Sequence, residues 1–180
     1  INKKELDEDA NELKVEKGLN LFYWDMKYPA PEILSDAFMS LAYTGGAKAP
    51  PGKYTITLNL NGQEETKTLQ ILKDPRWSGI SNKDLRDQFT FTQEVKSKLE
   101  EVHNAIKKVR SVRSQVNKTA KMAVDNGFTD ELSAQAKVID KKLIKLEEKL
   151  IQTKNESGQD PINYPPMLDD QFAYLYSVSC

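Results

Sequence analysis

The spacing of hydrophobic positions changes near residue 77 of this 180-residue chain. Before that point, residues 53–60 (KYTITLNL) alternate apolar and polar side chains, which is typical of a half-buried strand. After it, apolar residues recur at steps of three and four, which is typical of one face of a long helix. The positions of this helical stripe are Leu85, Val95, Leu99, Val102, Ile106, Val109 and Val116. The pattern predicts a small β unit followed by a helical unit.

The pair Asn61-Gly62 separates two strand-like runs and predicts a β-hairpin of residues 53–60 with residues 63–72. Both turn residues tolerate the positive φ angles that a type I′ turn requires. A two-residue loop places Tyr54 opposite Leu69, with both side chains apolar. The same register places Leu58 opposite Glu65, so the tip of the hairpin is expected to project beyond the core.

Three more short strands are predicted before the hairpin, at residues 13–15, 21–24 and 37–43. Proline and glycine between these runs supply the turns. About five strands within residues 13–76 favour a small immunoglobulin-like β-sandwich, so the expected fold class is α+β. Its expected core is Trp24, Tyr54, Ile56 and Leu58.

The helical unit is expected to cover residues 80–180. Ser81 or Asn82 caps a first helix of about 40 residues, which ends at Asn126-Gly127. Thr129 is the expected cap of a second helix, which should pack antiparallel to the first as a helical hairpin. A last helix after residues 164–166 (YPP) would complete a three-helix bundle, with Leu168, Phe172 and Leu175 on one face. The expected bundle seam is Leu99, Val102, Ile106, Ile139, Leu143 and Leu146.

Charge is almost balanced, with 26 Lys and Arg against 27 Asp and Glu, which disfavours a nucleic-acid partner. The basic run at residues 107–113 is interpreted as a solvated helix face. Residues 1–12 are mostly charged and are expected to be a linker from a preceding domain. No apolar run is long enough for a membrane span, so membrane insertion is not expected. Cys180 is the single cysteine, which excludes an internal disulfide.

Few residues offer catalytic chemistry. His103 is the only histidine and is interpreted as an ordinary residue at the helix surface or boundary. Asp25 is expected to bind nearby backbone N–H groups, and Asp169-Asp170 to favour the start of the last helix. Trp24 and Trp77 are expected to pack in the core or between units, although exposed rings could stack on sugars. No catalytic, cofactor-binding or metal-ligating residue is predicted, and no cofactor.

Two segments carry a family resemblance: residues 18–29 (GLNLFYWDMKYP) and residues 45–58 (GGAKAPPGKYTITL). Together they resemble the C-terminal region of exported bacterial proteins with sortilin-like, BNR/WD40-type β-propeller repeats, often labelled glycosyl hydrolases. Lys27 stands where that pattern usually has Arg. The segment around Tyr54 also resembles the immunoglobulin-like domain of flagellar hook-capping proteins, where it marks the fold alone.

The resemblance implies an accessory module that follows a propeller domain and is exported to the periplasm or cell exterior. We therefore expect a non-catalytic interaction module whose partner is the upstream propeller domain of the same protein, with a further protein or glycan as a possible ligand. Two alternatives stay open. One is carbohydrate binding or glycosidase activity within these residues, and the other is an oligomerising coiled coil built on the heptad-like spacing of the first helix.

Overall fold

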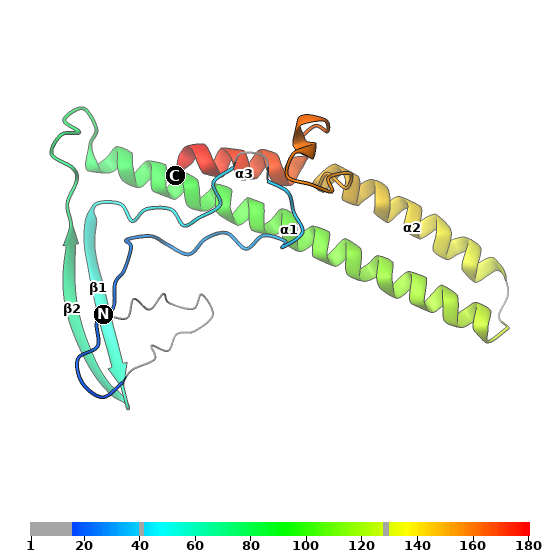
Figure 1. Cartoon of the computed structure of the whole chain (residues 1–180), viewed down its shortest axis with the longest axis horizontal. Helices are drawn as coiled ribbons and strands as arrows, with labels where there is room; N and C mark the ends of the chain where they lie inside the picture. The colour runs from blue at the N-terminus through cyan, green and yellow to red at the C-terminus, as the bar shows by residue number, and fades with distance from the viewer. Residues whose placement is uncertain (1–15, 40–41, 128–129) are drawn as a thin grey trace. The chain divides into compact units, whose positions relative to one another are not determined.

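The computed structural model describes residues 16–39, 42–127 and 130–180 (Figure 1). Two strands come first and are followed by helices. The elements are β1 (Gly52–Leu60), β2 (Gln63–Ile71), α1 (Asn82–Asp125), α2 (Asp130–Leu150), the 3-10 turn η1 (Asp160–Ile162) and α3 (Leu168–Ser179). The chain forms two compact units. Of the described residues, the first combines 16–30 with 45–89, and the second combines 31–39, 42–44, 90–127 and 130–180.

β1 and β2 form the antiparallel hairpin that the sequence predicts. Tyr54 pairs with Leu69 and Leu58 pairs with Glu65, so the expected register is confirmed. The turn residues Asn61 and Gly62 have φ angles of 51° and 81°, as a type I′ turn requires. Only residues that tolerate positive φ fit both turn positions, and this requirement sets the register.

The expected β-sandwich is wrong. Within the described residues the sheet has two strands, and residues 21–24 form no strand. The expected strand at residues 13–15 lies outside the described residues. In the expected strand at 37–43, residues 40–41 also lie outside them, and the remaining residues form no strand. The expected core is also wrong, because Ile56 and Leu58 are 52% and 48% exposed. The alternation in β1 is real, but the described chain supplies no second sheet to cover its apolar side.

A short backbone bridge organises the first unit beside the hairpin. The Tyr28 N–H donates to the Ala47 carbonyl at 2.8 Å, and the Ala49 N–H donates to the Met26 carbonyl at 2.7 Å. This bridge buries Ala47 and Ala49. The segment that precedes it reaches the hairpin, because the ring of Trp24 lies 5.7 Å from that of Tyr54, a contact distance for aromatic rings.

α1 begins and ends close to where the sequence predicts. Ser81 and Asp84 form a reciprocal cap, in which the Ser81 N–H donates to the Asp84 carboxylate and the Asp84 N–H donates to the Ser81 hydroxyl. Gly127, with φ of 74°, follows the helix end at Asp125. Thr129, the expected cap of the second helix, lies outside the described residues. The apolar stripe is buried in the second unit at Val95, Leu99, Val102, Ile106 and Val109.

α2 and α3 lie one after the other along α1 within the second unit, which is therefore not a three-helix bundle (Figure 1). The Thr92 hydroxyl donates to the Ser179 carbonyl at 2.7 Å, which places the end of α3 beside the early part of α1. Arg113 binds Asp140 and Arg110 binds Glu147, which places α2 beside the later part of α1 and confirms the antiparallel hairpin. The stretches of α1 around Thr92 and around Arg113 thus have different helical neighbours, α3 and α2.

The core of the second unit centres on Leu99, Ile106 and Tyr176, all fully buried. The α1 half of the expected seam is confirmed, since Val102 is buried as well. The α2 half is wrong at Ile139 and Leu146, which are exposed, while Leu143 is half-buried. α2 is rotated so that Asp140 and Glu147 meet arginines of α1, and this moves the apolar pair away from the contact. Among the described residues, no helix is both long and apolar enough to cross a membrane.

Candidate functional site

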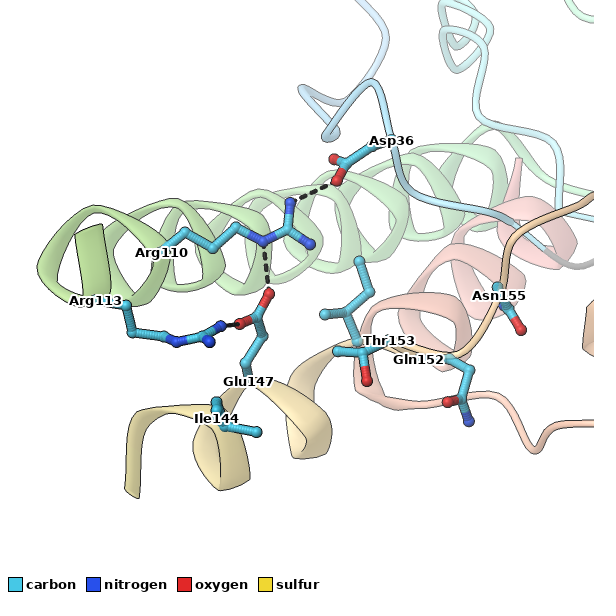
Figure 2. A pocket seen from close by; sticks show the side chains of 9 residues that line it. Asp36, Arg110, Arg113, Ile144, Glu147, Gln152, Thr153 and Asn155 are labelled. Atoms are coloured by element: carbon cyan, nitrogen blue, oxygen red, sulfur yellow. Dashed lines mark hydrogen bonds and ion pairs between the residues drawn. The ribbon is translucent and has the colours of Figure 1, made fainter. Parts of the chain in front are cut away.

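A pocket of about 380 Å³ lies in the second unit, where α1, α2 and the segment after α2 meet (Figure 2). We call it the arginine pocket. Arg110 and Arg113 contribute its positive charges from α1, and Glu147 its central negative charge from α2. The lining is Asp36, Arg110, Arg113, Ile144, Glu147, Ile151, Gln152, Thr153 and Asn155.

Glu147 lies between the two arginines and is bound to both. Its Oε1 accepts from Arg110 Nε at 2.6 Å, and its Oε2 accepts from Arg113 Nη1 at 2.7 Å (Figure 2). Arg110 Nη1 also donates to Asp36 at 2.7 Å, and Arg113 Nε to Asp140 at 3.0 Å. Two guanidinium groups therefore satisfy three carboxylates, an arrangement that suits planar arginine donors. Both arginines belong to the basic run at residues 107–113, which the sequence analysis interpreted as a solvated helix face. That interpretation is wrong for Arg110 and Arg113, because they form ion pairs with other segments.

Hydrogen bonds in and beside the arginine pocket shift the pKa values of Arg110, Arg113 and Asp140. Burial lowers the pKa of Arg110, but hydrogen bonds to Glu147 and Asp36 outweigh this and raise it. Burial and hydrogen bonds act in the same way on Arg113, whose pKa is also raised. The bond from Arg113 lowers the pKa of the Asp140 carboxyl. The network joins α1 to α2 by ion pairs.

The segment of residues 31–37 is fastened along α1, and we call it the strap. Its backbone and one carboxylate bind three α1 side chains, at positions 100, 103 and 110. The contacts are Glu32 N–H to Glu100 Oε1 at 3.1 Å, Leu34 N–H to His103 Nδ1 at 3.3 Å, and Asp36 Oδ2 to Arg110 Nη1 at 2.7 Å. Leu34 and Ala37 also pack on the core around Val102 and Ile106. The arginine pocket and the strap therefore share one face of α1.

His103 is fully buried in this arrangement, so its interpretation as a surface or boundary residue is wrong. Its Nδ1 accepts a hydrogen bond, which requires the proton of the neutral ring to be on Nε2. Among the described residues, Nε2 has no hydrogen-bond partner. Burial, followed by the positive charge of Lys107, lowers the pKa of His103. A general base would need the Nδ1 lone pair, but the Leu34 N–H already occupies it and the ring is buried, so His103 has a structural role in this arrangement.

Asp169 and Asp170 lie in the first turn of α3, as the helix-dipole interpretation predicts. Both are buried, and Asp169 Oδ1 has no hydrogen-bond partner within the described residues. Burial raises the pKa of Asp169 to about 6. A carboxyl with this pKa can hold a proton near neutral pH. The start of α3, however, favours an acidic residue at this position whether or not it has any chemical role.

The other candidates from the sequence are not brought together. Asp25 accepts from the Lys27 N–H at 3.0 Å, which confirms its expected backbone role. Trp77 is exposed, so the expectation that it is packed is wrong; Trp24 is 39% exposed and packs on the ring of Tyr54 outside any core. Among the described residues, no group of three or more His, Cys, Asp and Glu side chains could hold a metal ion.

One surface of the first unit was missed by the sequence interpretation, which assigned it to the core. Side chains at alternate positions of a strand share a face, so Tyr54, Ile56, Leu58 and Leu60 line one side of β1. Leu69 and Ile71 of β2 belong to the same side, which we call the apolar hairpin face. The reverse side carries polar residues, half of them threonine, and is also exposed.

The described chain thus offers a charge-paired pocket, a buried neutral histidine and an uncovered apolar sheet face. The first two hold segments together, whereas the third is available for contact with another protein surface. No protein-family profile, curated protein or solved structure matches this chain.

Proposed function

We propose that this chain is a non-catalytic accessory module that docks on another domain through its apolar hairpin face. The proposed partner is the upstream propeller domain of the same exported protein, in line with the resemblance of residues 18–29 and 45–58. The observation that carries the proposal is the exposure of Ile56, Leu58 and Leu60 on one side of a hairpin whose reverse side is polar.

Physical chemistry favours a covered hairpin. A two-stranded sheet alone is at best marginally stable in water, and it becomes stable when its apolar side packs on something else. Burying the exposed half of each large aliphatic side chain is worth on the order of 1 kcal/mol. Ile56, Leu58 and Leu60 together would therefore supply a useful part of a docking energy. Glu65 and Lys67 lie on the same side and give the contact a polar component.

The glycosidase alternative has weaker support. Such enzymes place two carboxyl groups across a cleft, one as acid and one as base or nucleophile. In the arginine pocket, Asp36 and Glu147 are both bound to Arg110, so they are occupied in ion pairs. Trp77 is exposed and keeps glycan binding as a second candidate, testable on a glycan array.

Binding between this chain and the purified propeller domain of its parent protein tests the proposal. Isothermal titration calorimetry should show association that Ile56→Asp and Leu58→Asp each weaken at least tenfold. Thr55→Asp and Thr57→Asp are the matched controls, because they add the same charge on the reverse side of β1. Equal loss in both pairs would contradict docking through the apolar hairpin face, and no association with the wild-type chain would contradict the proposed partner.

A further inference from the structure

A second uncovered surface lies in the other unit, on the outer side of α2. Leu132, Ile139 and Leu146 are spaced by seven residues and therefore form a line along the helix. They are 47%, 44% and 46% exposed, so no described element covers them. We call this line the α2 stripe. The positions three residues further on are Gln135, Lys142 and Lys149, which place two lysines beside the stripe.

The helical hairpin around this stripe is basic, although the whole chain has a formal net charge of −1. Residues 104–150 contain eleven Lys and Arg and six Asp and Glu, which gives this segment a net charge of +5. Nine lysines of the segment are exposed, and none of them makes an ion pair with another described residue. They are Lys107, Lys108, Lys118, Lys121, Lys137, Lys141, Lys142, Lys145 and Lys149.

The inner ion pairs make the outer surface more basic still. Asp140 and Glu147 could have balanced the lysines of α2, but both turn inward to Arg113 and Arg110. Glu148 and Glu131 are the acidic residues of α2 whose side chains are described as exposed. The α2 stripe is thus an apolar line in a positive field, and its missing partner should be apolar and acidic.

We propose that the α2 stripe binds an amphipathic helix of a partner protein whose apolar line is flanked by Asp and Glu. Heptad spacing suits a helical partner, because two helices meet along side chains that repeat every seven residues. Lys142 and Lys149 would pair with the acidic flank and Ile139 would contact the apolar line. This interface lies apart from the apolar hairpin face, so it adds a binding activity to the proposed function.

Two other occupants fit less well. A second copy of the chain would bring its own Lys142 and Lys149 toward those of the first, and like charges at such positions oppose pairing. A bilayer requires an apolar face that sinks about 5–10 Å below the head groups. The side chains of the stripe are 44–47% exposed and form one narrow line. Lys137 and Lys141 lie on another side of α2, so the lysines do not mark a single membrane-facing side.

Designed peptides test the proposal directly. The probe is a fluorescein-labelled three-heptad helix with Leu and Ile in one line and Glu on both flanks. Two comparison peptides have the same apolar line with Lys flanks, or the same composition as the probe in scrambled order. Fluorescence anisotropy with the whole chain should show saturable binding of the probe at least tenfold tighter than either comparison peptide. Raising the salt from about 50 mM to about 500 mM should weaken binding, because the flanking charges are screened.

Matched variants locate the site. Lys142→Glu with Lys149→Glu should weaken probe binding at least tenfold, and Ile139→Ser should weaken it without any change of charge. The control is Lys137→Glu with Lys141→Glu, which makes the same charge change on another side of α2 and should reduce binding less than threefold. Far-UV circular dichroism verifies that every variant keeps its helices, so that lost binding is not lost folding.

Several outcomes would overturn the inference. The first is that the folded chain shows no saturable binding of the probe. The second is that the lysine-flanked or scrambled peptide binds equally well. The third is that the Lys142/Lys149 and Lys137/Lys141 variants lose probe binding to the same extent. Cosedimentation with vesicles of anionic phospholipid that Ile139→Ser abolishes would assign the stripe to a membrane surface instead. A dimer seen by light scattering and removed by Ile139→Ser would assign it to self-association. Because Ile56 and Leu58 are not involved, this test can fail while docking of the hairpin succeeds.

Discussion

His103 Nδ1 accepts the backbone N–H of Leu34 at 3.3 Å, and through this bond a fully buried ring fastens the strap to α1. The bond exists only while Nδ1 carries no proton. Protonation of the ring would remove the acceptor and leave a charge in the core beside Lys107 and Arg110, with Asp36 as the nearby opposite charge. The strap is therefore held by a contact that acid breaks.

Acidification should destabilise the chain through His103. Its pKa in the folded state is lowered, mainly by burial, so the unfolded chain binds the proton first as the pH falls. The stabilising effect of the neutral ring is complete above the unfolded pKa of about 6.5 and is lost as the pH falls toward the lower folded value. Urea unfolding between pH 7.5 and 5.5 should show a loss of at most about 1.4 kcal/mol from this group.

The control for this pH effect is His103→Asn. The amide oxygen of Asn can accept the Leu34 N–H but does not titrate. This variant starts from a lower stability because the side chain is smaller, yet its unfolding free energy should lack the histidine part of the pH slope. Since the chain has a single histidine, an unchanged slope would show that His103 does not cause the wild-type loss.

Asp169 should act in the opposite direction. Burial raises its pKa to about 6, so the folded chain takes up this proton before the unfolded chain does. The ionised carboxyl weakens the fold above pH 6, and the penalty disappears as the pH falls toward the unfolded value of about 4. Asp169→Asn should stabilise the chain by roughly 1–3 kcal/mol at pH 8 and by much less at pH 4, measured by urea unfolding. The control is Asp125→Asn, which removes an exposed carboxyl and should not stabilise the chain at either pH.

The parts of the fold that the sequence predicted are those fixed by local chemistry. Asn61-Gly62 requires one turn type, and that turn determines the hairpin register. Ser81 and Asp84 cap α1, and Gly127 follows its end. In each case a few residues that are neighbours in sequence determine the backbone conformation, so it can be predicted without knowledge of distant contacts.

The sandwich and the bundle seam could not be predicted because long-range contacts decide them. Alternation in β1 reports an amphipathic strand but does not say what covers its apolar side. The apolar residues of α2 likewise lie on more than one face of the helix. The face that turns toward α1 is determined by two ion pairs, Asp140 with Arg113 and Glu147 with Arg110. Opposite charges on separate helices leave no trace in hydrophobic spacing, so the rotation of α2 and the arginine pocket were missed. The strap was missed for the same reason, since it depends on backbone donors.

Removing the central carboxylate of the arginine pocket should be costly. Glu147→Gln leaves Arg110 and Arg113 close together without the charge that both bind. Breaking a buried ion pair by removing one partner typically costs about 3–5 kcal/mol, and the partial exposure of the arginines places the expected loss near about 2–3 kcal/mol. Glu148→Gln is the matched exposed control and should change stability by less than about 0.5 kcal/mol. Similar urea midpoints for the two variants would contradict a structural role for the pocket.

Truncation of apolar side chains should distinguish the observed seam from the expected one. Ile106 is fully buried on α1, so Ile106→Ala should destabilise the second unit by about 2–5 kcal/mol. Ile139 is 44% exposed on the α2 stripe, and Ile139→Ala should cost less than about 1.5 kcal/mol. Thermal unfolding followed by circular dichroism at 222 nm measures both. If the two variants lose equal stability, α2 packs with its stripe inward and the rotation described above is wrong.

Gly46 should tolerate no side chain, because the first unit folds closely around it. A Cβ atom at this position would lie 1.8 Å from the Tyr28 carbonyl oxygen, a backbone atom that cannot move without disturbing the bridge to Ala47. Gly46→Ala should therefore separate the segment of Trp24 from Tyr54, shift the tryptophan emission and speed amide exchange at Tyr28 and Ala49. Gly79→Ala is the control, since a Cβ there meets nothing within 4 Å. If both variants keep the exchange rates of the wild-type chain, the bridge does not organise this unit as described.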